Sequence, residues 1–156
     1  MKAITYYKAG RMDLQDLIDL RIAFALELTG TQAEASIDSL RTNLEQFFIK
    51  MFNQETGIFY LAKSDEKCVG IGGLIFREHP GNFKNPSGRV GYLMNMYSIP
   101  SFRRKGICSK LIKLLIEDAK NSGITAFELH ATKEGEFVYR KVGFEIHDEP
   151  TYRKYI

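Results

Sequence analysis

A basic turn that contains glycine carries the clearest chemical signal in the sequence. It runs from Pro100 to Ser109, with Arg103, Arg104 and Lys105 directly before Gly106. An apolar stretch typical of a strand precedes it, and an amphipathic stretch typical of a helix follows it. A helix N-terminus offers unpaired N–H groups and the positive end of the helix dipole. The turn therefore predicts a phosphate or pyrophosphate site, although a solvated charged turn would have the same residues.

The side chains of this turn also suit an anion. Arg103, Arg104 and Lys105 can neutralise phosphate charge, and Ser109 adds a hydroxyl within the first helical turn. Gly106 has no side chain to keep the backbone away from a ligand. A coenzyme with a diphosphate is the ligand class that this combination favours.

Hydrophobic periodicity predicts the elements that position the turn. Apolar residues at three-and-four spacing predict helices over residues 13–29, 34–52, 107–121 and 133–142. β-prone stretches predict strands over residues 3–8, 58–62, 68–76, 89–99, 124–131, 144–147 and 151–156. The sequence shows no repeat and no linker, so we expect one α+β domain over residues 1–156 with a central mixed sheet.

The composition is that of an ordinary globular protein. Of the 156 residues, 44% are hydrophobic and 26% charged, and the formal net charge is +3. That charge is too small to indicate nucleic-acid binding, and no run of about 18 apolar residues indicates a membrane span. The N-terminus lacks the apolar core of a signal peptide. Cys68 and Cys108 form neither a CxxC pair nor a Cys/His cluster, so we expect a cytoplasmic protein without a disulfide framework or metal site.

Two motifs and the strand before the basic turn resemble the GNAT superfamily of acyl-CoA-dependent N-acetyltransferases. The family's Arg/Gln-x-x-Gly-x-Gly/Ala signature matches Arg103, Gly106 and Cys108, and its Tyr-x-x-x-Gly-Phe signature matches Tyr139 to Phe144. The order of the expected elements is similar to the family fold along essentially the whole chain. The resemblance implies a mostly antiparallel sheet of about seven strands flanked by about four helices. It also implies acetyl-CoA as the cosubstrate and no metal.

The resemblance assigns roles to particular residues. It implies that the pyrophosphate is held by Arg103, Arg104, Lys105, Gly106, Ile107, Cys108 and Ser109. It also implies that the strand at Met96, Tyr97 and Ser98 splays from its neighbour. Backbone groups of Met96 and Ser98 then bind the pantetheine arm, and one N–H faces the thioester carbonyl. Tyr139 is the expected acid that protonates the leaving thiolate, although helix packing alone would also explain this tyrosine.

The sequence departs from the family pattern at two positions. Cys108 stands where the family usually has Gly or Ala, and a small apolar role suits it better than a reactive one. A thiol at a helix N-terminus can nevertheless have a lowered pKa. Thr132 stands where many members have an Asn that contacts the cofactor, and its hydroxyl would replace that contact only in part.

No residue identifies itself as the base that takes the amine proton. Glu27, Glu78 and His79 are candidates, although each is explained more simply as a solvated surface group. Asn95 cannot ionise, but a family base sometimes comes from its strand. Glu27 and Asn95 are therefore the candidate substrate residues. His130 lies in an expected strand and shows no metal-ligand spacing, so packing or a surface role suits it better.

These observations predict an N-acetyltransferase that transfers an acetyl group from acetyl-CoA to a primary amine of a small molecule or peptide in a ternary complex. A non-catalytic acyl-CoA-binding module on the same fold is the first alternative. A nucleic-acid-binding protein is the second, and the scarcity of aromatic residues among the cations counts against it. The acceptor stays open, and a homodimer through the terminal strand is the one assembly that the sequence suggests.

Overall fold

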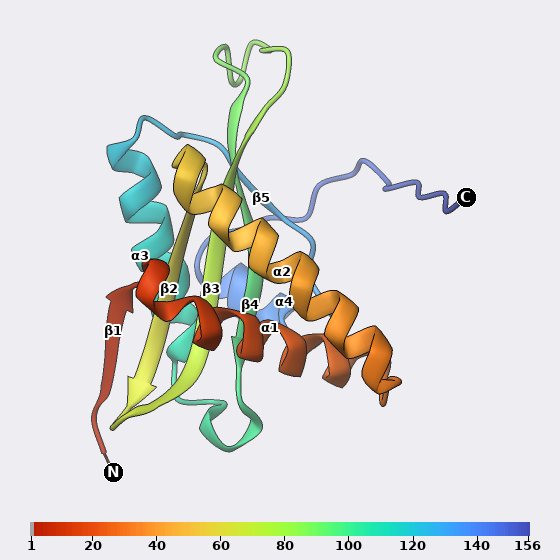
Figure 1. Cartoon of the computed structure of the whole chain (residues 1–156). Coiled ribbons are helices and arrows are strands. Elements are labelled where there is room, and N and C mark those ends of the chain that lie inside the picture. Colours follow the sequence, from red (N-terminus) through yellow and green to blue (C-terminus); the bar gives the residue numbers. More distant parts are fainter. Residues whose placement is uncertain (1) are drawn as a thin grey trace.

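The structure is a computed structural model that describes residues 2–156 (Figure 1). Its strands are β1 (Ile4–Lys8), β2 (Gly57–Ser64), β3 (Lys67–Glu78), β4 (Arg89–Ser98) and β5 (Phe127–Leu129). Its α-helices are α1 (Leu14–Thr29), α2 (Glu34–Gln54), α3 (Ile107–Asn121) and α4 (Glu136–Lys141). The α+β class and the four expected helices are confirmed.

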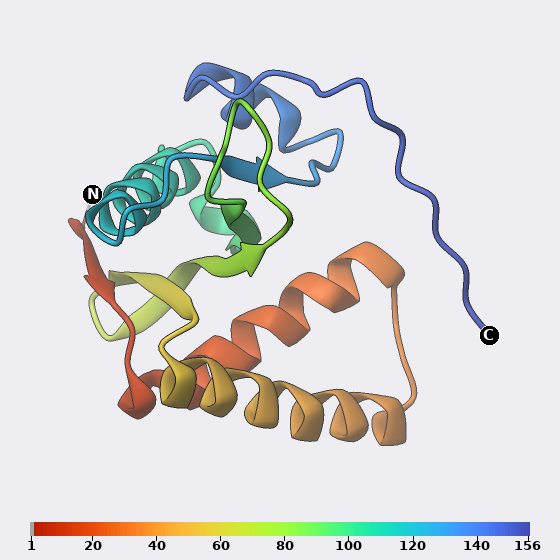
Figure 2. The same ribbon diagram turned by 90° about the horizontal axis from the view of Figure 1, so that it is seen from above.

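The strands form one sheet in the order β1-β2-β3-β4-β5. Neighbouring strands are antiparallel except for β4 and β5, which are parallel. The sheet is therefore mixed and mostly antiparallel, as expected. Helices α1 and α2 cover one face, and α3 and α4 lie on the other (Figure 2).

The expected strands over residues 144–147 and 151–156 do not form, so the described sheet has five strands rather than about seven. Residues 145–156 are exposed throughout, and this segment runs away from the body (Figure 1). Tyr152, Tyr155 and Ile156 favour extended backbone, but a strand also needs a hydrogen-bonding partner. No described segment pairs with them. The expected strand over 124–131 shortens to Phe127–Leu129, the residues that pair with β4.

An aromatic cluster joins α2 to the sheet. Phe48 and Phe59 are fully buried, and their ring centroids lie 5.0 Å apart in an edge-to-face arrangement. Phe47 and Phe52 also meet the ring of Phe59 edge-on, at 6.4 and 5.9 Å. Edge-to-face pairs stabilise a core beyond the area that they bury. The cluster therefore fixes α2, and through it α1, against the sheet.

Replacing Phe59 with Ala is expected to lower the free energy of unfolding by about 3–5 kcal/mol, because it leaves a cavity at the centre of this cluster. Phe83→Ala is the matched control, because Phe83 is fully exposed in the loop between β3 and β4. We expect that control to change stability by about 0.5 kcal/mol or less. Chemical denaturation of both variants measures the difference, and equal losses would contradict the buried role of Phe59.

The other face of the sheet anchors the first turn of α3. Ile107 and Leu111 are buried there in a cluster with Ala62 and Val69. A Cβ at Gly70 would lie 2.7 Å from Cγ2 of Ile107. A glycine at this point of β3 therefore lets the helix start close to the sheet, which fixes the basic turn before it.

A bulge in β4 and an early separation from β5 open the sheet. The register passes from Gly73 opposite Met94 to Ile71 opposite Tyr97, which adds one residue to β4. Asn95 lies in this bulge with a φ of 59°. Pairing with β5 ends where Leu93 faces Leu129, so the outer edge of β4 has no strand partner from residue 94 to 98. The splay implied by the resemblance is present at this place.

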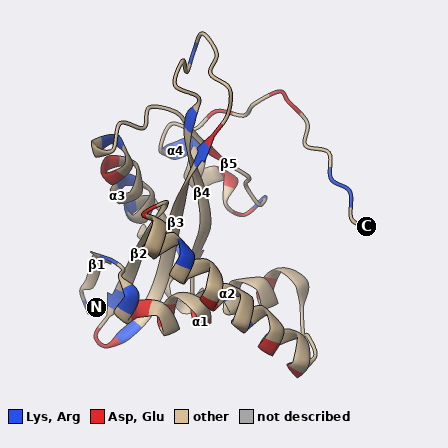
Figure 3. Cartoon of the chain, turned by 45° about the horizontal axis from the view of Figure 1, so that its top comes forward, with Lys and Arg blue, Asp and Glu red and all other residues tan. Residues whose placement is uncertain are grey.

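Charged residues of both signs are distributed along the chain, and α3 carries both (Figure 3). Among residues 2–156, no helix is both long and apolar enough to cross a membrane. Within the same residues, no three His, Cys, Asp or Glu side chains are grouped so that they could hold a metal ion.

Candidate active site

The basic turn ends in a conformation that exposes backbone amides. Arg104 and Gly106 both adopt left-handed backbone, with φ values of 61° and 77°. A Cβ at Gly106 would meet nothing within 4 Å, so glycine is needed there for its conformation and not for space. The first N–H groups of a helix have no intrahelical acceptor, and in α3 no side chain caps them either. These amides and the exposed Arg104 and Lys105 form a site that suits a pyrophosphate.

The side chain of Arg103 is bound to two neighbouring residues in this structure. Its Nη2 donates to Oε2 of Glu27 at 2.6 Å, and its Nε donates to the carbonyl of Ser98 at 3.1 Å. The hydrogen bond from Arg103 holds the pKa of Glu27 below its ordinary value. The pair ties the end of α1 to the basic turn. Glu27 is therefore not a free carboxylate, and the neutralisation of phosphate by the side chain of Arg103 stays a prediction.

A cavity of about 120 Å³ opens where β4 and β5 separate. The structure brings several expected site residues to its wall, namely Asn95, Met96, Cys108, Thr132 and Tyr139. Phe24, Leu93, Met94, His130, Gly135 and Val138 complete the lining. Tyr97 is buried outside the cavity and stacks on Phe24, with ring centroids 5.3 Å apart. The cavity lies between the start of α3 and the unpaired edge of β4, so it is the candidate active site.

Asn95 is buried without hydrogen-bond partners for its carboxamide. Only 3% of the residue is exposed, and neither Oδ1 nor Nδ2 has a partner among the described residues. Leaving a buried amide unpaired costs about 1–3 kcal/mol. Because the side chain lines the cavity, a polar ligand group there would satisfy it. Its position supports the choice of Asn95 as a candidate substrate residue.

Tyr139 reaches the cavity from α4. Its ring packs edge-on against Phe144 at 6.3 Å, so the two aromatic residues of the second motif hold each other. Burial, with smaller contributions from Cys108 and Tyr92, raises the pKa of Tyr139 to about 12. The phenol therefore keeps its proton at neutral pH and can act only as a proton donor.

The thiol of Cys108 is held in its protonated form. Burial raises its pKa, and the opposing effects of Ser98 and Arg103 are smaller. The thiolate is therefore disfavoured, which corrects the alternative of a lowered pKa. Cys108 lines the cavity as a small apolar side chain.

The structure reveals a hydrogen-bonded chain that the sequence analysis missed. The hydroxyl of Tyr92 lies 2.7 Å from Nδ1 of His130, and Nε2 of His130 lies 3.2 Å from Oγ1 of Thr151. His130 follows β5 directly and lines the cavity, and it is exposed, so a surface position is one of the two roles expected for it. The partners are distant in sequence, and no local spacing could have joined them.

The other base candidates lie far from the cavity. Glu78 faces Arg89 at the outer end of the β3–β4 hairpin, and His79 follows it. Arg89 and Asn95 are six residues apart on one strand, which corresponds to roughly 20 Å. Neither Glu78 nor His79 lines the cavity. The loop over residues 80–88 therefore extends beyond the sheet, away from Asn95 (Figure 1).

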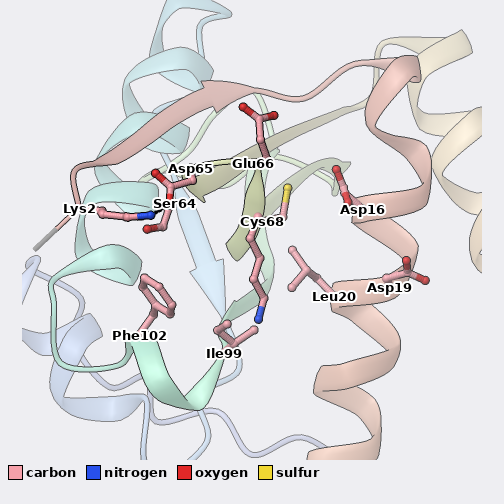
Figure 4. Close-up of a pocket in the computed structure, with 11 residues that line it drawn as sticks. Lys2, Asp16, Asp19, Leu20, Ser64, Asp65, Glu66, Cys68, Ile99 and Phe102 are labelled. Carbon is pink, nitrogen blue, oxygen red and sulfur yellow. Dashed lines mark hydrogen bonds and ion pairs between the residues drawn. The ribbon is translucent and has the colours of Figure 1, made fainter.

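A larger and more open pocket of about 830 Å³ lies elsewhere, between α1 and the β2–β3 turn (Figure 4). None of the motif residues lines it. Two of its carboxylates are already paired, Asp65 with Lys2 at 2.5 Å and Asp19 with Arg41 at 2.7 Å. Size alone therefore does not make it the better candidate.

Sequence comparison places the chain among acetyltransferases. The model of the acetyltransferase (GNAT) family matches residues 22–144. YjgM of Escherichia coli, an uncharacterized N-acetyltransferase, is 24% identical over 119 residues, which are 74% of this chain and 67% of that protein. The chloroplastic GCN5-related N-acetyltransferase 6 of Arabidopsis thaliana is 33% identical over 63 residues. That match spans 38% of this chain and only 22% of the relative.

Solved structures share the fold over nearly the whole chain. A "predicted acetyltransferase with acetyl-CoA" from Clostridium acetobutylicum has a TM-score of 0.86 at 27% identity, covering 97% of this chain and 96% of that one. AAC(6')-Iy in complex with a bisubstrate analog has a TM-score of 0.75 at 19% identity, covering 99% of both chains. The second likeness shows the fold alone.

Proposed function

Because the chain belongs to the GNAT acetyltransferase family, we propose that it transfers an acetyl group from acetyl-CoA to a primary amine of a small molecule or peptide. The amine attacks the thioester directly while both substrates are bound. One observation carries the proposal: exposed amides at the start of α3, the unpaired edge of β4 and the half-buried phenol of Tyr139 surround one cavity.

The residues present fit the parts of acetyl-CoA, which supplies the activated acetyl thioester. The amides from Gly106 to Ser109 bind the pyrophosphate, with Arg104 and Lys105 adding charge. The free edge of β4 from Met94 to Ser98 bonds the pantetheine arm as an added strand would. Thr132 and the carboxamide of Asn95 offer further polar contacts inside the cavity.

Tyr139 donates a proton to the departing sulfur, and Tyr92 with His130 removes one from the attacking amine. In this scheme Nδ1 of His130 accepts from the Tyr92 hydroxyl, and Nε2–H donates to Thr151. As the N–C bond forms, the amine proton passes to the oxygen of Tyr92, and the Tyr92 proton passes to His130. As the C–S bond breaks, Tyr139 gives its proton to sulfur. Solvent then takes the proton from His130 and returns one to Tyr139, so the charges balance.

Acetyl-CoA binding tests the first step without an acceptor. Titration calorimetry is expected to detect acetyl-CoA binding to the wild-type protein. Gly106→Ala is expected to weaken that binding about tenfold or more, because L residues resist left-handed backbone and the amides would turn away. Gly30→Ala is the matched control, because Gly30 also has a positive φ, 79°, and open space at its Cβ, but lies at the end of α1.

The control is expected to lose stability and keep its affinity for acetyl-CoA. Absence of binding in the wild-type protein would remove the proposed function. Binding without thiol release from any member of a broad amine library would favour the non-catalytic acyl-CoA-binding module instead.

A further inference from the structure

Two arginines without anionic partners lie behind residues that line the cavity or contact its wall. Arg21 on α1 is half-buried, and its guanidinium lies 5.5 Å from the ring centroid of Phe24, which lines the cavity. Arg77 on β3 stacks over the ring of Tyr92 at 3.6 Å. Within residues 2–156, neither guanidinium forms an ion pair or a side-chain hydrogen bond. Arg77 is exposed, but Arg21 is half-buried, and guanidinium groups taken out of water are normally paired.

Both arginines lie on the face of the sheet that α1 covers. Ile75 faces Tyr92 in the register between β3 and β4, and Arg77 is two residues further along β3, so it shares their face. Arg21 is one helical turn before Phe24, on the helix that packs against this face. Burial lowers the pKa of Arg21, and the nearby Tyr92 opposes that shift. Tyr92 is therefore the common neighbour of both guanidinium groups and of His130.

We propose that the acceptor carries an oxyanion, a carboxylate or phosphate, beside its reactive amine, and that Arg21 and Arg77 hold this group. The inference rests on the proposed function, and it names the substrate class of the same site. A guanidinium offers planar, two-point donation that matches these oxyanions. With the anion between the two arginines, the amine lies at Tyr92, at the start of the proton path. α-Amino acids and amino sugar phosphates meet this description.

Polycationic acceptors do not fit these charges. A polyamine or aminoglycoside would place ammonium groups near two unpaired guanidinium groups. The carboxylate of Glu27 on α1 is already bound to Arg103 and offers no compensation. Glu128 faces Tyr92 across the β4–β5 pair, is exposed and forms no ion pair among the described residues. Because a carboxylate beside Tyr92 repels an anion, Glu128→Gln is expected to keep kcat/KM for an anionic acceptor unchanged or to raise it.

Thiol-release kinetics with matched acceptors test the inference. Each amino acid set contains the free acid, its carboxamide and its decarboxylated amine, for example L-methionine, L-methioninamide and 3-(methylthio)propylamine. Glucosamine 6-phosphate and glucosamine form the phosphate set, which separates the two sources of oxyanion. The anionic member of at least one set is expected to have a kcat/KM about 10- to 100-fold above its neutral or cationic analogues.

The arginine variants test which residues produce that preference. Arg21→Met and Arg77→Met are each expected to raise KM about tenfold for the anionic acceptor and to leave the decarboxylated amine nearly unchanged. Arg41→Met is the control, because Arg41 is a partly exposed arginine paired with Asp19 outside the cavity. If the carboxamide and the amine have the same kcat/KM as the acid in every set, the inference is overturned. An anion preference that persists in both arginine variants would do so as well.

A binding measurement separates this inference from the proposed function. N-acetylglycine, a product analogue, is titrated into protein saturated with CoA, and N-acetylglycinamide is titrated in parallel. Tighter binding of the acid, lost in Arg21→Met, supports the inference, and equal binding overturns it even if no acceptor turns over. Failure of acetyl-CoA to bind at all would overturn the proposed function and this inference with it.

Discussion

Tyr139→Phe is expected to lower kcat by about 10²- to 10³-fold and to leave the affinity for acetyl-CoA nearly unchanged. The substitution removes only the hydroxyl that donates a proton to the leaving sulfur. The ring and its edge-on contact with Phe144 remain, so binding and folding should survive. Single-turnover thiol release is the appropriate measurement, because slow product release can hide a chemical step in kcat.

Tyr152→Phe is the matched control, because Tyr152 is 91% exposed in the C-terminal segment. It should leave the rate unchanged. A Tyr139→Phe enzyme with the wild-type single-turnover rate would remove Tyr139 from the mechanism.

The raised pKa of Tyr139 sets a further expectation for the pH profile. A group with its pKa raised to about 12 keeps its proton until the pH approaches that value. The acid form is therefore present throughout a practical assay range, and Tyr139 should produce no loss of rate on the alkaline side below about pH 10. A phenol with this pKa is a weak acid, so its proton transfer has to accompany C–S cleavage rather than precede it.

The helices were the most predictable part of the fold. The limits of α3 follow from an apolar stripe that begins directly after Gly106 and ends before Gly123, and the structure reproduces them. Both signals, the apolar stripe and the flanking glycines, are local, so they predict the helix whatever the arrangement of the sheet. The segment Thr151–Ile156 shows the opposite case. Its residues favour extended backbone, but whether a strand forms depends on a partner elsewhere in the chain.

The candidate site likewise has features that local sequence predicts and features that depend on distant residues. The start of α3 and the position of Tyr139 lie in continuous motifs, and the structure brings both to one cavity. The pairing of Arg103 with Glu27 joins positions 76 residues apart, so local spacing could not reveal it. The raised pKa of the Cys108 thiol depends on burial, which local sequence does not show. The contact of Tyr92 with His130 likewise forms only after β5 lies beside β4.

The contact between Tyr92 and His130 leads to the second prediction with a large expected effect. Tyr92→Phe and His130→Asn are each expected to lower kcat/KM by about 10²-fold, because either change interrupts the path of the amine proton. Asn at position 130 can still accept a hydrogen bond from Tyr92, but it cannot take a proton. If the two residues act as one unit, the double variant should be hardly slower than either single variant. His147→Asn is the control, because His147 is exposed in the C-terminal segment.

The double variant is the decisive measurement for this path. Losses in the double variant that simply multiply would contradict the relay, and so would a wild-type kcat/KM in either single variant. Arg77 from β3, Arg21 from α1 and Glu128 from β5 are the charged groups that face this pair, and none of them is changed in these variants.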